Sequence, residues 1–522
     1  MKKIRIGLLF LFLLVAGCDS QVTSNKESKK MSWSIDQNVV KDSKHRVFYE
    51  IFVRSFADSN GDGIGDLNGV TKQLDYLKEL GIGGIWLMPI QPSPSYHGYD
   101  VTDYYDVNQD YGTLADMKRL VEEAHKRDIK IVMDLVMNHT SNKHPWFQKA
   151  LTGDPDYRDF YVWSDVQTNT NELGDWNQKI WHGESESKYE GIFWDGMPDL
   201  NYRNPAVMEE MKKIGSFWLQ ELDVDGFRLD AAKYLFSSHQ VKDHHDKNAA
   251  LWEEFKQSTQ NAKSDSFLVG EIWDTPSIVG TYLHGLDSGF NFDLSSKILS
   301  SVKQEKDAGI ASSLERTRAY FQNVSNEFVD SIFITNHDMN RVMSEVAGNQ
   351  DQAKMAASLL FTLPGNPYVY YGEEIGLEGK KPDENIREPM IWSENKDDSL
   401  NTTWINRKYS KNAEQLAVSV QKSDKTSLYN HYKTMISVRK GRSALLAGEI
   451  KGSDVRKQGL VSFERMNEEE SLLVLHNITS KKMTITIPKE WKDVYFSSQS
   501  YAKKDQELIL APYSTIIFEK EV

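Results

Sequence analysis

The sequence lacks several features that would place it in a class at once. Cys18 is its only cysteine in 522 residues, so no disulfide can form within the chain. It has no basic excess: 62 lysines and arginines against 76 aspartates and glutamates give a net charge of −14. This charge argues against nucleic acid as a partner and suits a neutral substrate or bound cations. The sequence also shows no repeat of solenoid length.

The composition is that of a soluble globular protein of two or three domains. Hydrophobic residues make up 39% of the chain and charged residues 26%. At this length a single hydrophobic core is not expected, because cores stop growing at about 250–300 residues.

The N-terminal segment differs from the rest. Residues 1–5 are basic, and Ile6 to Gly17 is an apolar run of a length that suits a signal peptide rather than a membrane-spanning helix. Val15-Ala16-Gly17-Cys18 resembles a bacterial lipobox, so we expect a lipoprotein signal peptide at 1–17 and a lipid on Cys18. The alternative is an ordinary cleavable signal. Residues 18–43 are polar and read as a flexible tether, which predicts a membrane-anchored protein outside the cytoplasm.

Strand and helix patterns alternate from about residue 44 to residue 445. This alternation predicts a parallel α/β architecture, and about eight units favour a closed (β/α)8 TIM barrel. The patterns expected as strands are His45–Phe56, Ile82–Ile90, Ile129–Met137, Gly226–Leu229, Phe267–Ile272, Ser331–Thr335 and Pro367–Tyr371. Those expected as helices are Val70–Leu80, Met117–Arg127, Met208–Leu222 and Leu251–Ala262.

Two segments interrupt or follow this alternation. Residues 139–203, after the third strand, are too long for a simple connection. They predict a small inserted subdomain within a barrel of residues 44–138 and 204–445. Residues 446–522 change to short alternating strands, which predicts a C-terminal antiparallel β-sandwich domain.

A Gly-rich polar loop follows the first strand. Asp58, Asn60, Asp62 and Asp66 stand at positions 1, 3, 5 and 9 of a calcium-loop pattern, and Ile64 offers its carbonyl at position 7. Position 12 is a glycine, so no EF-hand is predicted. We expect Ca²⁺ to bind here; the alternative is a polar turn without metal.

Four polar clusters stand at the C-terminal ends of predicted strands. In a β/α barrel these ends meet on one face, where active sites are built. Within the second cluster, Arg228 and Asp230 are two residues apart and should point to the same side of their strand, so that the guanidinium holds the carboxylate in place. Paired carboxylates fit glycosidic cleavage better than a metal site. The clusters are Asp134/Asn138/His139, Arg228/Asp230, Glu271 and Asn336/His337/Asp338.

In this order the clusters resemble the four signature regions of the α-amylase family of glycoside hydrolases. The matching segments are DLVMNHT (134–140), GFRLDAAKY (226–234), GEIW (270–273) and NHD (336–338). The resemblance covers roughly residues 44–522, and the calcium-loop pattern resembles the family's loop in the first β/α connection.

The resemblance implies catalytic roles for three carboxylates. Asp230 would be the nucleophile that forms a glycosyl-enzyme, Glu271 the acid/base, and Asp338 the group that binds sugar hydroxyls and stabilises the transition state. The implied reaction is hydrolysis with retention. The residues implied to bind substrate are His97, Tyr99, Asp100, His139, Arg228, Lys233, His337 and Arg387.

Three further features bear on which subgroup of the family the sequence resembles. Met197–Asn201 resembles the group between oligosaccharide-type and maltodextrin-type enzymes, and Ala231 resembles members that prefer α-1,4 bonds. Asp100 and Arg387 resemble a pair that closes the non-reducing side in exo-acting α-glucosidases, which puts endo-action in question.

We therefore expect an α-amylase that cleaves α-1,4 bonds of starch and maltodextrins. The alternatives are an exo-acting α-glucosidase, or a maltodextrin-type hydrolase or transglycosylase. A non-catalytic glucan-binding lipoprotein is the alternative from a different class, and the intact set of three carboxylates argues against it. The expected partners are the α-glucan and the membrane, with no nucleic acid, and a monomer is expected.

Overall fold

A computed structural model describes residues 44–184, 187–395 and 398–520. Cys18, the signal peptide and the tether lie outside this range. No helix in the described part of the chain combines the length and the apolar composition needed to cross a bilayer.

Eight parallel strands form the central sheet, in the order β8-β7-β6-β3-β2-β1-β10-β9. A parallel bridge between Phe290 and Ser331 joins the two ends of this order, so that the sheet closes into a barrel. The strands are β1 (Phe48–Ile51), β2 (Gly84–Leu87), β3 (Lys130–Leu135), β6 (Gly226–Leu229), β7 (Phe267–Gly270), β8 (Ser288–Gly289), β9 (Ser331–Phe333) and β10 (Asn366–Tyr370).

Large side chains fill the barrel. Phe48, Trp86, Val132, Val269 and Phe333 belong to one buried cluster, and each comes from a different strand. The outward-facing residues of the same strands pack against the helices in a second, larger core. Because strands covered on both faces bury nearly every residue, they read in the sequence as continuous apolar runs.

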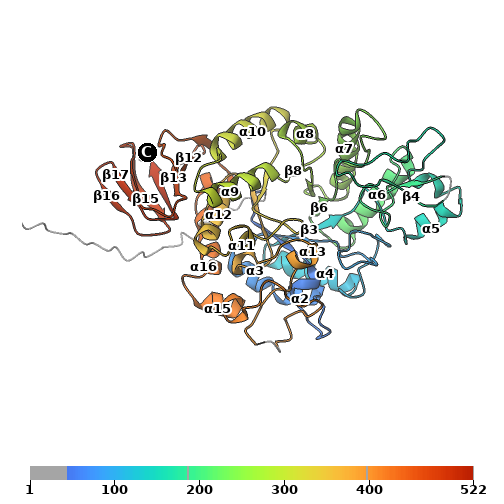
Figure 1. Cartoon of the computed structure of the whole chain (residues 1–522), viewed down its shortest axis with the longest axis horizontal. Helices are drawn as coiled ribbons and strands as arrows, with labels where there is room; N and C mark the ends of the chain where they lie inside the picture. Colours follow the sequence, from blue (N-terminus) through green and yellow to red (C-terminus); the bar gives the residue numbers. More distant parts are fainter. Residues whose placement is uncertain (1–43, 185–186, 396–397, 521–522) are drawn as a thin grey trace, which may run out of the picture. The chain divides into compact units, whose positions relative to one another are not determined.

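Helices connect the strands and cover the barrel (Figure 1). The longer ones are α4 (Leu114–Lys126), α6 (Pro205–Gln220), α7 (His244–Ala262), α9 (Phe292–Gln304), α10 (Ile310–Val324), α12 (Gln350–Thr362) and α16 (Leu428–Lys440). The shorter ones are α1 (Val53–Phe56), α2 (Leu67–Lys72), α3 (Leu74–Leu80), α5 (Pro145–Leu151), α8 (Pro276–Thr281), α11 (Val342–Glu345), α13 (Asp383–Ile386), α14 (Ala413–Leu416), α15 (Val418–Ser423) and α17 (Ser443–Ala447), with 3-10 turns η1 (Arg158–Phe160) and η2 (Glu373–Ile375).

Between β3 and α6 the chain forms an irregular insertion. It contains α5, η1 and the two-stranded pair of β4 (Trp181–His182) and β5 (Tyr189–Glu190). Its return to the barrel is anchored at the end of β3, where the Asn138 side-chain amide donates to Asp199 at 2.9 Å. A bridge between His139 and Asp199 adds a backbone link, so the insertion starts and ends beside the third strand.

The C-terminal segment forms two antiparallel sheets, drawn in red in Figure 1. A buried guanidinium group ties it to α12, since Arg465 donates to the Thr362 carbonyl at 2.6 Å. The five-stranded sheet holds β11 (Glu449–Gly452), β12 (Leu460–Met466), β13 (Ser471–Asn477), β18 (Ser514–Lys520) and β15 (Trp491–Ser497), and the three-stranded sheet holds β14 (Met483–Thr486), β17 (Glu507–Leu510) and β16 (Ala502–Lys504).

The predicted fold class, a TIM barrel followed by an antiparallel β domain, is confirmed. Two local predictions are wrong. The run His45–Phe56 is not one strand, because β1 ends at Ile51 and the chain turns into α1. The run Val70–Leu80 is not one helix, because α2 ends before Gln73 and α3 follows it.

Candidate active site

The barrel register places two of the predicted catalytic carboxylates side by side. Leu229 of β6 pairs with Gly270 of β7, and each is followed directly by a carboxylate, Asp230 and Glu271. The backbone N–H of Glu271 donates to the Leu229 carbonyl at 3.0 Å, which continues the ladder beyond the strands. The two side chains therefore leave the same end of neighbouring strands.

One guanidinium group connects these carboxylates. Arg228 Nη1 lies 2.7 Å from Asp230 Oδ1, and its Nη2 lies 2.8 Å from Glu271 Oε2. The same Nη1 lies 2.9 Å from Asp134 Oδ1 on β3. The predicted contact between Arg228 and Asp230 is confirmed, and the guanidinium also reaches two further carboxylates that the spacing alone did not reveal.

Two cations hold the third predicted carboxylate. His337 Nε2 lies 3.0 Å from Asp338 Oδ2, and Arg387 Nη2 lies 3.1 Å from Asp338 Oδ1. Arg387 also donates from Nε to the His337 carbonyl at 3.1 Å. Each oxygen of Asp338 thus has its own positively charged neighbour, which fixes the orientation of the carboxylate.

Tyr99 links the two groups of residues. Its hydroxyl lies 2.7 Å from His337 Nε2 and donates to Asp134 at 3.1 Å, while its ring stacks on the His337 ring at 5.5 Å. His139 Nε2 lies 3.1 Å from the Tyr99 carbonyl, and His97 Nδ1 accepts from the Tyr99 N–H at 3.1 Å. Both histidines therefore support the tyrosine through its backbone.

Burial dominates the ionisation of the first two carboxylates. It raises the pKa of Asp230 and of Glu271, while the nearby Arg228 charge opposes both shifts. The negative charge of Asp338 raises both pKa values further, the His337 charge lowers that of Asp230, and the Asp230 charge raises that of Glu271. Both carboxyl groups are therefore shifted toward the protonated form, and ionisation of one opposes ionisation of the other.

Asp338 behaves in the opposite way. Burial alone would raise its pKa, but His337 and Arg387 lower the pKa overall, so the group is ionised. Burial would lower the pKa of His337, but Asp338 and Glu50 raise it to about 9. The site therefore contains an ionised carboxylate, Asp338, beside two carboxyl groups whose pKa is raised by burial, Asp230 and Glu271.

Asp100 and Arg387 each contact other residues. Arg387 contacts Asp338 and lies 3.3 Å from Asp383 of α13. Asp100 instead accepts hydrogen bonds from the Ser93 and Ser95 hydroxyls. His97 Nδ1 lies 3.9 Å from Asp100 Oδ1, and burial lowers the pKa of this histidine. Asp100 and Arg387 thus have separate partners, and their role at the non-reducing side stays a prediction.

Lys233 follows Asp230 on the same loop. Its ammonium donates to Asp274 Oδ2 at 2.9 Å and to the Trp273 carbonyl at 3.0 Å. The Trp273 ring is 55% exposed and stacks on Phe292 at 4.4 Å. The Lys233 ammonium is thus held at the backbone of Trp273, which closely follows Glu271 in the sequence.

Side chains of the predicted calcium loop accept hydrogen bonds from the loop's own backbone. Asp58 Oδ1 accepts from the N–H groups of Asn60 and Gly61, Asn60 Oδ1 accepts from Asp62, and Asp62 Oδ1 accepts from Ile64, all at 2.7–2.9 Å. The donor set of carboxylates, one amide and one carbonyl is the oxygen chemistry that Ca²⁺ prefers.

The side chains of this loop do not all converge. Asp66 caps α2 by accepting from the Gly69 N–H at 2.7 Å. Within the described residues, no three His, Cys, Asp or Glu side chains gather as a metal site. A cation held by the loop therefore needs the Asn60 amide and the Ile64 carbonyl as well as the carboxylates.

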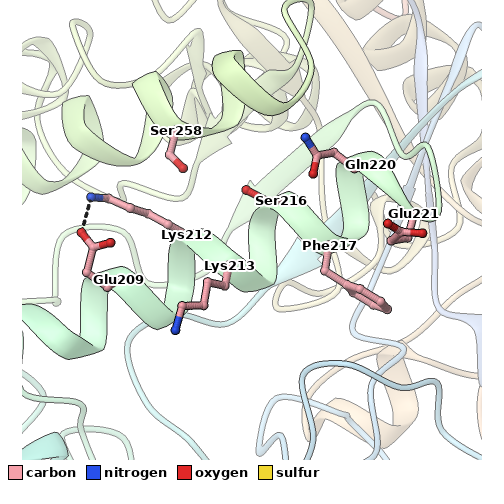
Figure 2. A pocket seen from close by; sticks show the side chains of 8 residues that line it. All are labelled: Glu209, Lys212, Lys213, Ser216, Phe217, Gln220, Glu221 and Ser258. Carbon is pink, nitrogen blue, oxygen red and sulfur yellow. Dashed lines mark hydrogen bonds and ion pairs between the residues drawn. The ribbon is translucent and has the colours of Figure 1, made fainter.

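A separate hollow of about 460 Å³ lies on the outer side of the barrel, between α6 and α7 (Figure 2). An ion pair between Lys212 and Glu209 at 2.8 Å borders it. It contains none of the predicted site residues. Its lining residues are Glu209, Lys212, Lys213, Ser216, Phe217, Gln220, Glu221 and Ser258.

Sequence reasoning missed Glu50, which is 1% exposed and lies 2.6 Å from His337 Nδ1. A glutamate within the aromatic run of β1 was the available signal, because a charge in a buried strand needs a partner. Reasoning also missed the contacts of Asp134, which accepts from the Trp86 indole at 3.1 Å.

A barrel whose strand ends carry three carboxylates around one arginine defines a class of glycoside-cleaving enzymes. The α-amylase catalytic-domain family matches residues 50–448, and the C-terminal domain family of the α-amylase SusG matches residues 460–517. The chain belongs to the α-amylase family of glycoside hydrolases.

Relatives of different activity share this family. The chain is 44% identical to α-amylase 3 of Dictyoglomus thermophilum, over 91% of this chain and 93% of that one. It is 38% identical to a 4-α-glucanotransferase of Thermotoga neapolitana, over 83% and 96%. The crystal structure of an α-amylase from H. orenii superposes with a TM-score of 0.85 at 41% identity, covering 92% of this chain and all of that one.

Proposed function

We propose that this protein is an α-amylase. It hydrolyses internal α-1,4 bonds of starch and maltodextrins, with retention of the anomeric configuration. The observation that carries the proposal is the Arg228 guanidinium, which contacts Asp230 at 2.7 Å and Glu271 at 2.8 Å. One small planar group thereby holds two carboxylates, which suits the spacing of about 5–5.5 Å found in retaining enzymes.

In the proposed reaction, Asp230 Oδ attacks the anomeric carbon while Glu271 gives its proton to the leaving oxygen. The glycosyl ester on Asp230 is then hydrolysed by water, which Glu271 deprotonates, so that both groups return to their starting states. Asp338 would accept hydrogen bonds from sugar hydroxyls, since His337 and Arg387 keep it ionised and oriented. Lys233 and the exposed Trp273 are the groups we assign to the leaving side.

The experiment uses a malto-oligosaccharide blocked at its non-reducing end. Endo-action predicts fragments from the middle of the blocked chain, at a rate close to that of the unblocked chain. Release of glucose from the unblocked chain alone would contradict endo-action.

The second candidate is transfer to a sugar acceptor. The exposed Trp273 face next to the acid/base favours it, because an aromatic face there can hold an acceptor sugar in place of water. Products longer than the starting oligosaccharide at millimolar substrate would establish this partition, and their absence would leave hydrolysis alone.

We further propose one Ca²⁺ in the loop of Asp58, Asn60, Asp62, Ile64 and Asp66. The loop carries three carboxylates within nine residues, and Asp58 and Asp66 are buried, a state that a cation stabilises. The ion would brace the loop between β1 and α2. Isothermal titration of chelator-treated protein should give one site, and no heat would remove the proposal.

We also propose that the mature protein is a monomer outside the cytoplasm, anchored through a lipid on Cys18. The lipobox-like sequence supports the anchor, and the presence of every site residue within one chain supports the monomer. Mass spectrometry of the mature N-terminus tests the first, and light scattering of the lipid-free chain tests the second.

A further inference from the structure

A chain of three buried side chains leads from the first barrel strand to the site. Glu50 of β1 lies 2.6 Å from His337 Nδ1, and His337 Nε2 lies 3.0 Å from Asp338 Oδ2. Glu50 is 1% exposed and His337 is also 1% exposed. The imidazole is thus held between two carboxylates, and only the inner one, Asp338, can meet substrate.

The partners of the His337 ring determine which of its two nitrogens carry hydrogen. A carboxylate at Glu50 has no hydrogen to give, so Nδ1 of His337 must donate to it. The Asp338 carboxylate, 3.0 Å from Nε2, likewise has no hydrogen to give, so Nε2 must donate to it. The Tyr99 hydroxyl lies 2.7 Å from the same nitrogen. Both ring nitrogens therefore carry hydrogen, and the ring is an imidazolium.

We propose that Glu50 is a positioning residue for the reaction: its buried charge keeps His337 doubly protonated, and His337 in turn holds Asp338 ionised and aimed at the sugar. The inference rests on the proposed role of Asp338. Glu50 itself touches no substrate, because His337 lies between it and the site.

The other charges around His337 act on the same ring and do not replace Glu50. Asp134 and Asp230 lie near enough for the ring to lower their pKa, from β3 and β6. Arg387 contacts the His337 carbonyl rather than the ring, and its charge opposes the imidazolium. Among these groups, Glu50 is the carboxylate that accepts at Nδ1. Substitution of Glu50 therefore removes the negative charge beside His337 Nδ1.

The test compares Glu50→Gln with a matched control. Glutamine keeps an oxygen to accept from Nδ1 and loses only the charge. Glu374→Gln makes the same change at another fully buried glutamate, which accepts from Tyr49 at 2.7 Å and from Tyr76 at 2.5 Å and has no contact with His337. Thermal unfolding verifies that both variants fold.

The main readout is the titration of His337 followed by NMR of histidine-labelled protein, with the signal assigned by its loss in His337→Gln. We expect Glu50→Gln to lower the pKa of His337 by about 1–3 units, the range for removing an adjacent opposite charge. We expect Glu374→Gln to leave it in place. An unchanged titration in folded Glu50→Gln overturns the proposal.

The alkaline limb of kcat/KM provides a second readout. In Glu50→Gln the limb should move to lower pH by a similar amount, because His337 loses its proton earlier. On a His337→Gln background the same substitution should move the limb no further. A shift that persists there would mean that Glu50 acts on Glu271 directly, and it would overturn the route through His337.

If Glu50→Gln does not fold, the wild-type titration decides, since a His337 that is neutral at pH 7 overturns the proposal. If the wild type does not cut malto-oligosaccharides while the His337 titration shifts as expected, the proposed function fails and the relation between Glu50 and His337 stands.

Discussion

Arg228 Nη2 lies 2.8 Å from Glu271 Oε2, although the two residues are 43 positions apart. The same guanidinium contacts Asp230, so the nucleophile and the acid/base of the proposed mechanism share one rigid cation. A planar group with several donors can hold two carboxylates at a fixed separation, whereas a single ammonium cannot.

Arg228→Lys should therefore lower kcat by about 100-fold or more while the charge is retained. Lysine cannot contact Asp230 and Glu271 in the same geometry. The measurement is kcat on a long malto-oligosaccharide. Arg318→Lys is the control, because Arg318 of α10 forms an ion pair with Glu449 of β11. Activity near the wild-type level in Arg228→Lys would show that the shared guanidinium is dispensable.

Glu271→Gln should separate the two steps of the reaction. Loss of the proton donor should lower the rate on malto-oligosaccharides by about 100- to 10,000-fold. The first step on a maltosyl substrate with an aryl leaving group that needs no proton should be much less affected. Burst kinetics measures this contrast, and equal losses on both substrates would argue against the acid role of Glu271.

The environment of Asp225 predicts that the free energy of unfolding depends on pH. Burial alone would raise its pKa, but His125 at 2.7 Å, Lys130 at 2.8 Å and the Ile131 N–H lower the pKa overall. A lowered pKa contributes stability above the unfolded-state value near 3.9, and this contribution is lost as the pH falls toward the folded-state pKa.

Asp225→Asn should consequently reduce the free energy of unfolding by about 2 kcal/mol at pH 7. The difference from wild type should shrink below about pH 4. Urea unfolding at several pH values measures it, with the exposed neighbour Asp223→Asn as control. A difference that stays constant down to acid pH would mean that the carboxylate charge is not responsible.

The calcium proposal predicts a metal-dependent melting temperature. Removal of the ion by a chelator should lower the Tm of the wild type, and added Ca²⁺ should restore it, since a ligand that binds the folded state stabilises it. Asp62→Asn should weaken this response because it removes one ligand charge. Asp103→Asn is the control, since Asp103 also accepts a backbone hydrogen bond in an exposed turn outside the loop. A Tm that does not respond to chelator in the wild type would exclude the ion.

Much of the barrel could be predicted because its strands are covered on both faces and read as apolar runs. The pattern Gly226–Leu229 matches β6 residue for residue. The pairing of Arg228 with Asp230 followed from the two-residue period of a strand. The strand β8 was not predicted, because its two residues, Ser288 and Gly289, are too few to form a strand pattern.

The remaining site contacts depend on the closed barrel. Glu50 and His337 are 287 positions apart and meet only because β1 pairs with β10 and β10 pairs with β9. The spacing of residues in a sequence carries no signal for such a contact. For the same reason, the sequence could not show that Arg387 contacts Asp338 and not Asp100.

The most direct measurement is covalent trapping of the glycosyl-enzyme with a fluorinated maltosyl fluoride, followed by peptide mass spectrometry. We predict one adduct per chain, on the peptide that contains Asp230, and no adduct in Asp230→Asn. An adduct on another carboxylate, or inversion of the anomeric configuration in the product, would contradict the assignment of Asp230 as the nucleophile.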